Sequence, residues 1–527
     1  MFLGGVVLAL LVSMLLIVVK LVPLKMLPFD NKNEFLVLVD MPRGTTLEKT
    51  GKVVSDLEYY FSKMDEVRDV ESYVGTASPV DFNGLVRQYY FRKGSYLADI
   101  RVNLVDKSRR TLQSHALILK MRPAIQKIAE KNGANIKIVE VPPGPPVLST
   151  IVAEVYGSAG NSYQDIMDQA TTVRKMMEST VDVVDIDDTI EAHQTRYHFL
   201  VDRTKAGLHG ITEEDIVHSA KIFLGGESPS IMHSGTEREP LEINLRLPLL
   251  LRSRPEDMGP LRVKARDGSM VPFNELGTLT TTTIEQTIYR KNLERVVYVT
   301  AEMAGRSPGE AILDLAKATR NNPLPPDFSV KWSGEGEWKI TLEVFRDLGL
   351  AFAGALILIY ILLVQQTESF SIPLVIMVAI PLTLIGILPG FALLNVFFTH
   401  TIGKYPDSIF FTATGMIGMI ALAGIVVRNS IILIDFIQGR TRAGVDPKQA
   451  IVESGAVRLT PICLTAGAAI FGSWIITLDP VFSGLAWSFI FGIFASTAFT
   501  LLVVPMIYHL IYGKTSGYKA VENGDSL

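Results

Sequence analysis

The stretch that decides the fold is residues 409–438, which reads IFFTATGMIGMIALAGIVVRNSIILIDFIQ. It exceeds the about 20 apolar residues with which a helix crosses a bilayer. Arg428 lies about 15 Å from the polar end at Gln438, at about 1.5 Å per residue, too far for easy contact with headgroups. A charge at this depth costs about 2.5–3.5 kcal/mol and is tolerated where it faces a partner or a wet cavity. We therefore predict a transmembrane helix in which Arg428 serves ion or substrate movement; a charge that only joins two helices is the structural alternative.

The composition indicates a membrane part and a large part in water. Of 527 residues, 48% are hydrophobic, yet 20% are charged. The mean hydropathy is +0.29. The net charge of −4 gives no indication of nucleic-acid binding, and we expect no nucleic-acid partner. The single cysteine, Cys463, excludes an internal disulfide framework.

Six apolar runs predict six transmembrane helices, one first and then five together. The first run follows Met1 directly, without a basic segment or a small-residue cleavage site, so we expect a retained helix rather than a signal peptide. Pro373, Pro381 and Pro389 predict a kink in the third helix. The runs are residues 2–19, 348–364, 372–398, 409–438, 461–478 and 485–512.

The charges of the short loops predict the orientation. The loop expected at residues 439–457 carries Arg440, Arg442 and Lys448 and is the most basic, so it should be cytoplasmic. Counting spans from this loop places both chain ends in the cytoplasm. Residues 31–339 then lie on the outer side of the membrane.

The first part of the outer region alternates short strands with amphipathic helices. The order is βαββαβ, that of the ferredoxin-like split motif. Thr45 or Thr46 is the expected N-cap of the first helix, and a proline-rich connector at residues 141–148 ends the unit. The expected strands are 34–40, 69–74, 97–105 and 135–141, with helices at 46–64 and 110–131.

A second βαββαβ unit is interrupted. Its first half is a strand, a helix and a strand (151–156, 163–178, 183–187), and its second half has the same order (295–302, 307–320, 328–333). The residues between the two halves have a different sequence pattern, and we interpret them as an inserted domain. The predicted fold is an α-helical membrane protein with an α+β region. Its parts are a first transmembrane helix (1–24), a first unit (25–147), a split second unit (148–190 and 287–340), the insertion (191–286), a five-helix region (341–513) and a tail (514–527).

Polar residues within the apolar runs form a candidate proton path. Asn429 follows Arg428, and Asp435 lies seven residues after Arg428, on the same helix face. Arg458 and Thr465 are also seven apart, although positive-inside anchoring explains Arg458 equally well and a bond to its own helix explains Thr465. Arginine does not titrate usefully. No carboxylate lies in the middle of the six runs, so we expect the carboxylates of the relay to come from another chain.

No catalytic constellation occurs outside the membrane runs. The sequence contains no GxSxG, no HExxH and no phosphate-binding glycine loop. We therefore expect neither an enzyme nor a cofactor. The methionines form no evident metal-relay pattern, which disfavours a copper or silver exporter, and we expect no metal site.

Four segments resemble one known family. The segment GMIALAGIVVRNSIILIDFI (418–437) resembles a helix of this family that has a central basic residue followed by asparagine. The family more often has lysine where Arg428 stands. Its segment with an arginine and a threonine is matched by VRLTPICLT (457–465). Its docking domain is similar to VDRTKAGLHGITEEDI (201–216) and DGSMVPFNELG (267–277). Over nearly its whole length the chain resembles the C-terminal half of resistance–nodulation–division (RND) efflux pumps of the acriflavine-resistance, hydrophobe/amphiphile type.

The resemblance implies a proton-driven exporter of hydrophobic or amphiphilic compounds in the inner membrane. The outer region would be periplasmic, with two porter subdomains and a docking insertion. The family's proton-accepting aspartates lie in an N-terminal half, so a complementary half is the expected partner, with Arg428, Asn429, Arg458 and Thr465 completing the relay. The resemblance also implies a trimer that joins a periplasmic adaptor and an outer-membrane duct.

One segment of the first unit is a candidate part of the substrate path. Residues 75–84 include Gly75, Pro79 and Phe82, which allow bending and contact with apolar molecules. By resemblance the segment falls where the family has a flexible loop in its binding pocket. An ordinary surface loop is the alternative.

Two other functions are compatible with the same sequence. One is a membrane-anchored interaction or sensing protein that does not transport. The other is a protein-export auxiliary of the same superfamily. The large split α+β region and the docking-like insertion favour the exporter.

Overall fold

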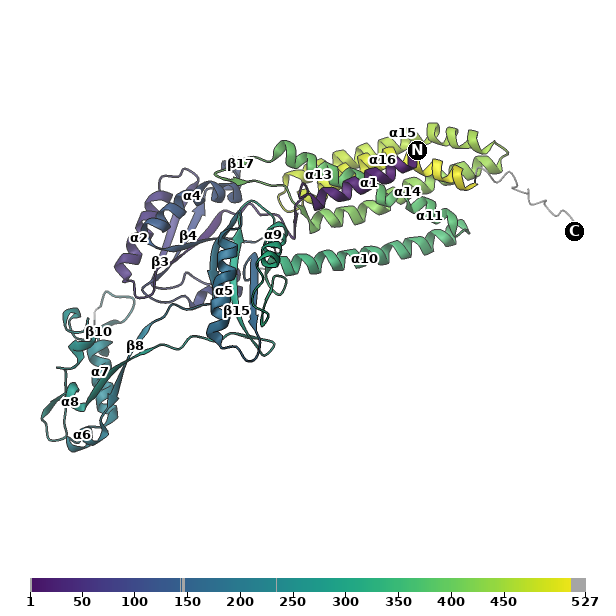
Figure 1. Ribbon diagram of the computed structural model, residues 1–527. Coiled ribbons are helices and arrows are strands. Elements are labelled where there is room, and N and C mark those ends of the chain that lie inside the picture. The colour runs from purple at the N-terminus through teal and green to yellow at the C-terminus, as the bar shows by residue number, and fades with distance from the viewer. Residues whose placement is uncertain (1, 143, 145–146, 234, 513–527) are drawn as a thin grey trace, which may run out of the picture. The chain divides into compact units, whose positions relative to one another are not determined.

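A computed structural model describes residues 2–142, 144, 147–233 and 235–512 of the chain (Figure 1). It divides into two compact units, one formed by Met1–Thr189 with Ile288–Leu527 and the other by Ile190–Thr287. The second unit occupies the region expected as an insertion, residues 191–286. The expected tail, residues 514–527, lies outside the described residues.

The first sheet has four antiparallel strands in the order β3-β4-β2-β5. Its strand β2 is buried on both faces because Val37 and Val39 pack under the helices, while Leu36 and Leu38 pack with Val139 on the opposite side. The elements are β2 (Glu34–Asp40), α2 (Leu47–Phe61), β3 (Val67–Val74), β4 (Leu97–Leu104), α4 (Ser114–Asn132) and β5 (Asn135–Glu140).

The second sheet repeats this topology around β6. In α5, Ser162 and Asp165 form a capping box, which fixes the start of the helix. The chain leaves the sheet after β7 and returns at β15, which pairs with both β6 and β7. The elements are β6 (Ile151–Gly157), α5 (Tyr163–Glu178), β7 (Val183–Asp188), β14 (Arg290–Lys291), β15 (Glu294–Met303), α9 (Pro308–Asn321) and β16 (Phe328–Lys331).

The segment expected as a loop at residues 75–84 is only partly a loop. The short helix α3 (Phe82–Val86) begins within it, and a 3-10 turn, η1 (Tyr89–Phe91), follows. Asp81 caps α3 by accepting a hydrogen bond from the Gly84 N–H at 2.6 Å. Phe82 is therefore the first residue of a helix, because an aspartate N-cap precedes it.

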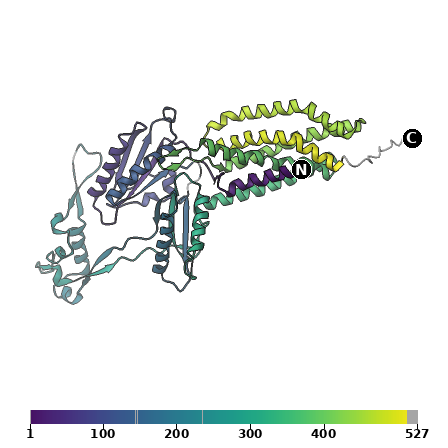
Figure 2. The same cartoon turned by 45° about the horizontal axis from the view of Figure 1, so that its top comes forward.

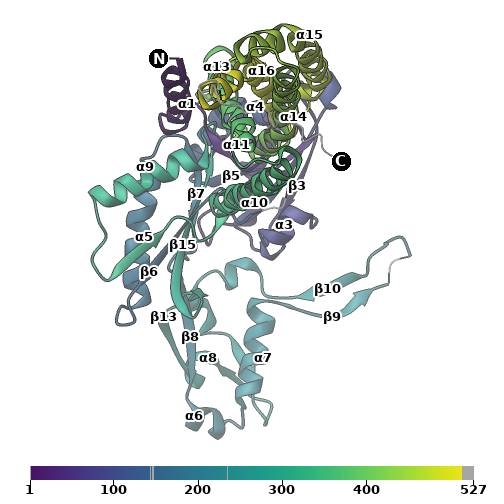
Figure 3. The same ribbon diagram turned by 90° about the vertical axis from the view of Figure 1, so that its right-hand side faces the viewer.

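The unit Ile190–Thr287, whose helices and strands are labelled in Figure 3, has its own small core. The antiparallel pair β8 (Thr195–Val201) and β13 (Gly277–Thr283) carries the chain in and out of it. The core contains Ile216, Phe273 and Leu276. The other elements are α6 (Arg203–Leu208), α7 (Glu213–Leu224), the hairpin β9 (Glu227–Met232) and β10 (Leu241–Leu245), β11 (Arg262–Lys264), β12 (Met270–Pro272) and α8 (Phe273–Leu276).

Five helices in the described part of the chain are long and apolar enough to cross a membrane. Figures 1 and 2 show them side by side with α1 (Phe2–Val18). Because α1 has 17 residues and is shorter than the five, the sixth span stays a prediction. The five are α10 (Gly336–Thr367), the Ser371–Phe398 segment, α14 (Ala413–Arg442), α15 (Pro447–Trp474, continued by η5, Ile475–Leu478) and α16 (Ser483–Tyr512).

The segment Ser371–Phe398 is broken where its prolines predict a kink. It consists of α11 (Ser371–Met377), α12 (Ala379–Leu382) and α13 (Leu384–Phe398). Pro381 has no N–H to donate, which weakens the helix ladder at the first break. Gly386 and Gly390 then let α13 approach α16 closely, because a Cβ at either glycine would lie within 2.5 Å of Phe491.

The loop expected at residues 439–457 is far shorter in the structure. Helix α14 runs to Arg442 and α15 begins at Pro447, so only four residues connect them. Asp446 caps α15 by accepting from the Lys448 N–H at 3.1 Å, and Gly444 adopts a left-handed φ of +87°. The basic residues assigned to this loop therefore lie at the ends of two helices.

Candidate functional site

The middle of α14 has one buried face and one open face. Asn429 and Ser430 are buried, whereas Arg428 is exposed. A Cβ at Gly424, one turn before Arg428, would meet no atom within 4 Å. The exposed positions recur every three or four residues, so they share one face. They are Ala421, Gly424, Arg428, Ile432 and Asp435.

Arg428 has no ionic partner among the residues that the structure describes. Its guanidinium forms no hydrogen bond or ion pair there. Asp435 is about 10 Å further along the helix axis, at about 1.5 Å per residue. The acidic residues of the five spans lie toward helix ends, namely Glu337, Glu343, Asp347, Asp435 and Glu453.

Arg458 and Thr465 are placed differently from each other. The guanidinium carbon of Arg458 lies 5.1 Å from the centre of the Phe436 ring, a cation–π contact that joins α15 to α14. Thr465 donates a hydrogen bond to the carbonyl oxygen of Ile462 at 3.0 Å. The structure thus brings Arg458 to α14, two turns beyond Arg428, and gives Thr465 a partner within its own helix.

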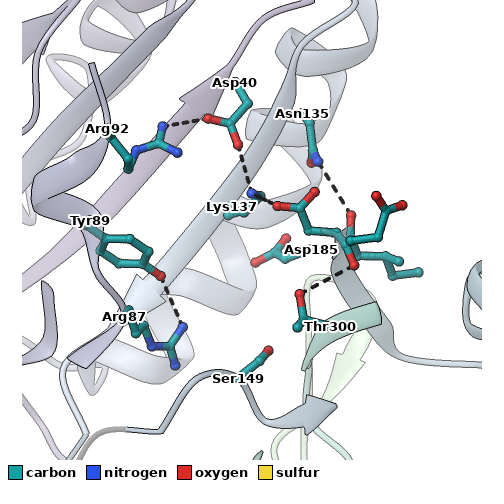
Figure 4. A network of polar contacts seen from close by, with 12 residues as sticks. Asp40, Arg87, Tyr89, Arg92, Asn135, Lys137, Ser149, Asp185 and Thr300 are labelled. Atoms are coloured by element: carbon teal, nitrogen blue, oxygen red, sulfur yellow. Dashed lines mark hydrogen bonds and ion pairs between the residues drawn. The ribbon is translucent and has the colours of Figure 1, made fainter. Parts of the chain in front are cut away.

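A network of ion pairs joins the two sheets along β5 and β7 (Figure 4). The Lys137 ammonium lies 2.8 Å from Asp40 and also pairs with Asp187. Arg92 lies 2.6 Å from the other oxygen of Asp40. Burial alone raises the pKa of Asp40, but Lys137 and Arg92 more than offset this, so the pKa is lowered. Burial lowers the pKa of Lys137, and the two aspartates reverse this and raise it.

A second, deeply buried pair strengthens the same junction. Arg122 of α4 pairs with Asp185 of β7, and both side chains are less than a tenth exposed. The other oxygen of Asp185 accepts a hydrogen bond from the Ile138 N–H at 3.0 Å. The Asn135 side chain donates to the carbonyl oxygen of Ile186 at 3.5 Å.

A third connection lies at the opposite end of the junction. Arg87, which follows α3, lies 2.8 Å from Glu302 of β15. Ser149 donates a hydrogen bond to the same carboxylate at 3.1 Å. Burial lowers the pKa of Arg87, but Glu302 and Tyr89 outweigh it and raise the pKa above its usual value. The charges of these three connections are therefore compensated within the chain.

The candidate substrate-path residues lie on one surface segment. Gly75 has a left-handed φ of +81°, and the carbonyl oxygen of Pro79 accepts a hydrogen bond from Arg101 at 2.6 Å. Phe82 is 68% exposed. The cavity between the sheets, about 510 Å³ in volume, is lined instead by α4, β5, α5 and β7, including Arg122.

The model of the AcrB/AcrD/AcrF family matches residues 2–512. The chain belongs to this family. The resemblance to RND efflux pumps is thereby confirmed at the family level, and the family consists of transporters. The hydrophobe/amphiphile subtype is not established, since relatives named for metal resistance also match.

The curated relatives include proteins named for multidrug export and proteins named for metal resistance. The swarming motility protein SwrC of Bacillus subtilis is 25% identical over 67% of this chain and 32% of its own length. The cobalt-zinc-cadmium resistance protein CzcA of Cupriavidus metallidurans is 27% identical over 60% of this chain and 29% of its own. The multidrug export protein AcrF of Escherichia coli is 22% identical over 88% and 43%.

A solved structure shares the fold of nearly the whole chain. A crystal structure of a heavy metal efflux pump superposes with a TM-score of 0.77 at 22% identity, covering 97% of this chain and 51% of the pump. At this identity the likeness shows the fold alone. The chain spans about a third of the length of SwrC and CzcA and about half of that of the heavy metal efflux pump.

Sequence reasoning did not predict the ion pairs of Lys137. Lys137 pairs with Asp40 of the same sheet, 97 residues away, and with Asp187 of the other sheet, 50 residues away. The one available signal was a charged residue inside the apolar run of β5, which reads NIKIVE. A lysine there is costly unless it is paired, so it indicated a partner without identifying it.

Proposed function

We propose that this chain is the C-terminal half of a proton-driven exporter of the inner membrane. The observation that carries the proposal is Arg428 on the open face of α14, at mid-span and without a carboxylate partner in the described chain. Such a charge is tolerated where it meets a partner or a wet cavity, and a carboxylate partner satisfies it most directly. A complementary half that packs on Gly424 and Arg428 and supplies aspartates provides that partner. The superposition on 51% of the heavy metal efflux pump supports it.

The arrangement suggests how a proton would drive a change of packing. An ionised aspartate of the complementary half is attracted to Arg428, which lowers the pKa of that aspartate. Arginine remains charged throughout. Protonation of the aspartate removes the attraction and favours a second packing of the two halves. Asn429, Arg458 and Thr465 belong to the same proposed wet path.

The proposed substrates are hydrophobic or amphiphilic organic compounds, drawn through the periplasmic α+β units. The exposed aromatic ring of Phe82 supports a contact with such molecules. Gly75, with its left-handed φ of +81°, and Pro79 belong to the same proposed path. The second candidate is export of metal ions, which the names of CzcA and of the heavy metal pump favour. Sensitivity of an expressing strain to dyes and, separately, to cobalt and zinc distinguishes the two.

The proposed assembly is a trimer with a periplasmic adaptor and an outer-membrane duct. Support comes from the hairpin β9–β10, whose apolar side chains Ile231, Leu241, Ile243 and Leu245 are exposed. Exposed apolar surface of this kind marks a protein–protein contact. The unit Ile190–Thr287 is the proposed docking insertion, and residues 25–147 with the split unit 148–190 and 287–340 are the proposed porter subdomains.

Thiol labelling tests the proposed topology. The variants Ser228→Cys and Ala443→Cys, each in a Cys463→Ser background because Cys463 is exposed, present thiols at exposed positions. An impermeant reagent should label Ser228→Cys from the periplasmic side and Ala443→Cys only after the inner membrane is opened. Ser454, which falls in the loop expected from the sequence, is unsuitable because it is buried. Labelling of both from one side contradicts the topology.

Dye export tests the function. Three kinds of cell should be compared. The first expresses this chain alone, the second expresses only a complementary half with paired membrane aspartates, and the third expresses both. Efflux of a hydrophobic dye should appear only with both and should collapse when the proton gradient is dissipated. Equal efflux from this chain alone would show that no complementary half is needed.

A further inference from the structure

A small, partly open cavity lies beside the ends of two apolar helices. Lys25 lines it from β1 (Leu24–Lys25), shortly after α1, and Glu337 lines it from the first turn of α10. The volume of the cavity is about 90 Å³, where one water occupies about 30 Å³. The space is therefore suited to a small polar group rather than to a drug-sized molecule.

The charges that line this cavity are balanced in number. Three are cationic and three are anionic, so a neutral occupant preserves the balance. Between them lie apolar groups, including Met26, Phe29 and Met303. The charged lining residues are Lys25, Arg87, Arg122, Glu140, Glu302 and Glu337.

Two of these charges, Lys25 and Glu337, have no bonded partner. Neither side chain forms a hydrogen bond or an ion pair with any residue that the structure describes. The other four are held in the pairs Arg87 with Glu302, Arg122 with Asp185, and Glu140 with His115.

Of these two side chains, Lys25 is the clearer case of a buried charge without a bonded partner. The residue is only 6% exposed, and its ammonium lies against the Phe29 ring, 3.1 Å from the ring centre. Burial lowers the pKa of Lys25, and the surrounding carboxylates oppose that shift only in part. A buried charge without a bonded partner costs several kcal/mol, so an occupant that bonds it stabilises the folded chain.

We propose that this cavity binds a small zwitterionic group, whose anion contacts Lys25 and whose ammonium contacts Glu337. One neutral occupant then satisfies both unpaired charges, and the apolar wall accepts the methylene groups beside them. The cavity is partly open and lies beside the ends of α1 and α10, which the proposed topology assigns to the outer leaflet, so a lipid headgroup is a candidate occupant. The favoured ligand is therefore a lipid headgroup with an ammonium and a phosphate; a free zwitterion is the other source of this chemistry.

Lipid binding to the purified full chain in a non-ionic detergent tests the site. Native mass spectrometry should compare dihexanoyl-phosphatidylethanolamine with dihexanoyl-phosphatidylglycerol, which has the same chains and phosphate but no ammonium. A bond between an ammonium and a carboxylate contributes about 1.5–3 kcal/mol, so the first lipid should bind about tenfold more tightly or better. Glu337→Gln should reduce the ratio of the two affinities to about one. Lys25→Met should weaken the binding of both lipids about tenfold.

Matched variants separate the site from general effects of charge. Lys20→Met and Glu335→Gln remove charges that pair elsewhere, with Asp314 and Lys291, and should keep the preference. The double variant Lys25→Met/Glu337→Gln should remain folded in a thermal scan, because it removes both unpaired charges together, and should show no preference.

Three results would overturn the proposal. The first is equal affinity of the unaltered chain for the two lipids, as a water-filled cavity gives. The second is a preference that persists in Glu337→Gln. The third concerns the source: if phosphoethanolamine alone displaces the lipid at equal concentration, the site takes a free zwitterion and the assignment to a lipid is wrong.

Discussion

Lys137 and Arg428 are two cations of one chain with opposite surroundings. Lys137, between the two sheets, contacts Asp40 and Asp187, both contributed by the same chain. Arg428, in the middle of α14, faces open space and contacts no carboxylate of the described residues. Both lie where an uncompensated charge is costly.

The difference indicates which cations find a carboxylate among the described residues. At the junction of the two α+β units, Lys137 is paired by carboxylates of the same chain. In the membrane bundle, Arg428 has no such partner among the described residues, and the proposed function assigns its carboxylate to another chain. We therefore expect substitutions at the first junction to act on stability and substitutions on the open face of α14 to act on transport.

The largest expected effect is at Arg428. Arg428→Ala should lower dye efflux by the complete assembly by about 100-fold or more, since an interaction on which the proton step depends is removed. Arg428→Lys should retain part of the efflux, because the charge survives without the planar fork of the guanidinium. Efflux rates should be normalised to the amount of protein in the membrane.

Arg440→Ala is the matched control for this prediction. Arg440 lies at the end of the same helix and pairs with Glu453 on the surface, so its loss should change efflux less than about twofold. Unchanged efflux in Arg428→Ala would reduce Arg428 to a helix-packing charge.

The next effect concerns the stability of the sheet junction. Lys137→Met leaves Asp40 and Asp187 close together, although Arg92 still holds Asp40. Breaking a buried pair costs about 3–5 kcal/mol, and we expect about 2–3 kcal/mol here because one partner remains and Asp187 is partly exposed. Chemical unfolding of the purified chain, followed by circular dichroism, measures the change.

Lys120→Met provides the control for the junction. Lys120 lies 3.3 Å from Glu66 on the surface, where a salt bridge contributes about 0–1 kcal/mol. Equal destabilisation by both variants would show that the Lys137 network is no stronger than a surface pair.

A smaller effect is expected at Phe82. Phe82→Ala removes an exposed ring without touching the Asp81 cap of α3, so the fold should be unchanged. We expect a severalfold change in efflux of aromatic compounds relative to aliphatic ones, from the loss of one ring contact. Resistance profiles of expressing cells measure this ratio, and an identical profile would leave residues 75–84 as surface structure.

The smallest effect is expected at Thr465. Its hydroxyl already bonds within its own helix to Ile462, and water can replace it in a wet path. Thr465→Ala should therefore change efflux less than about twofold, measured in the assay used for Arg428. A loss as large as that of Arg428→Ala would place Thr465 directly in the proton path.

Sequence reasoning located elements whose signals are local. The helix expected at residues 163–178 is found as α5 (Tyr163–Glu178), since Ser162, Asp165 and an apolar face on helical spacing define it. The connection between α14 and α15 was misjudged, because charged residues were taken to end the helices. Gly444 and the Asp446-Pro447 pair, which end one helix and start the next, were the better signals.

Contacts between distant segments were beyond sequence reasoning. The unpaired mid-span position of Arg428 could be inferred, because it needs only the composition of the runs. The junction of Lys137 with Asp187, and the neighbourhood of Lys25 and Glu337, depend on how separate elements pack. The sequence carries no local pattern that reports such packing.

The insertion between β7 and β15 also has a consequence for the order of synthesis. The strand β6, buried along almost its whole length, ends at Gly157, while its partners β15 and β16 begin at Glu294 and Phe328. Ribosomes add about 5–20 residues per second, so β6 waits on the order of 10 s for a partner. During this interval an apolar central strand has both edges open. The second sheet therefore keeps unpaired strand edges, which favour aggregation, for longer during synthesis than the first sheet, whose strands all lie between Glu34 and Glu140.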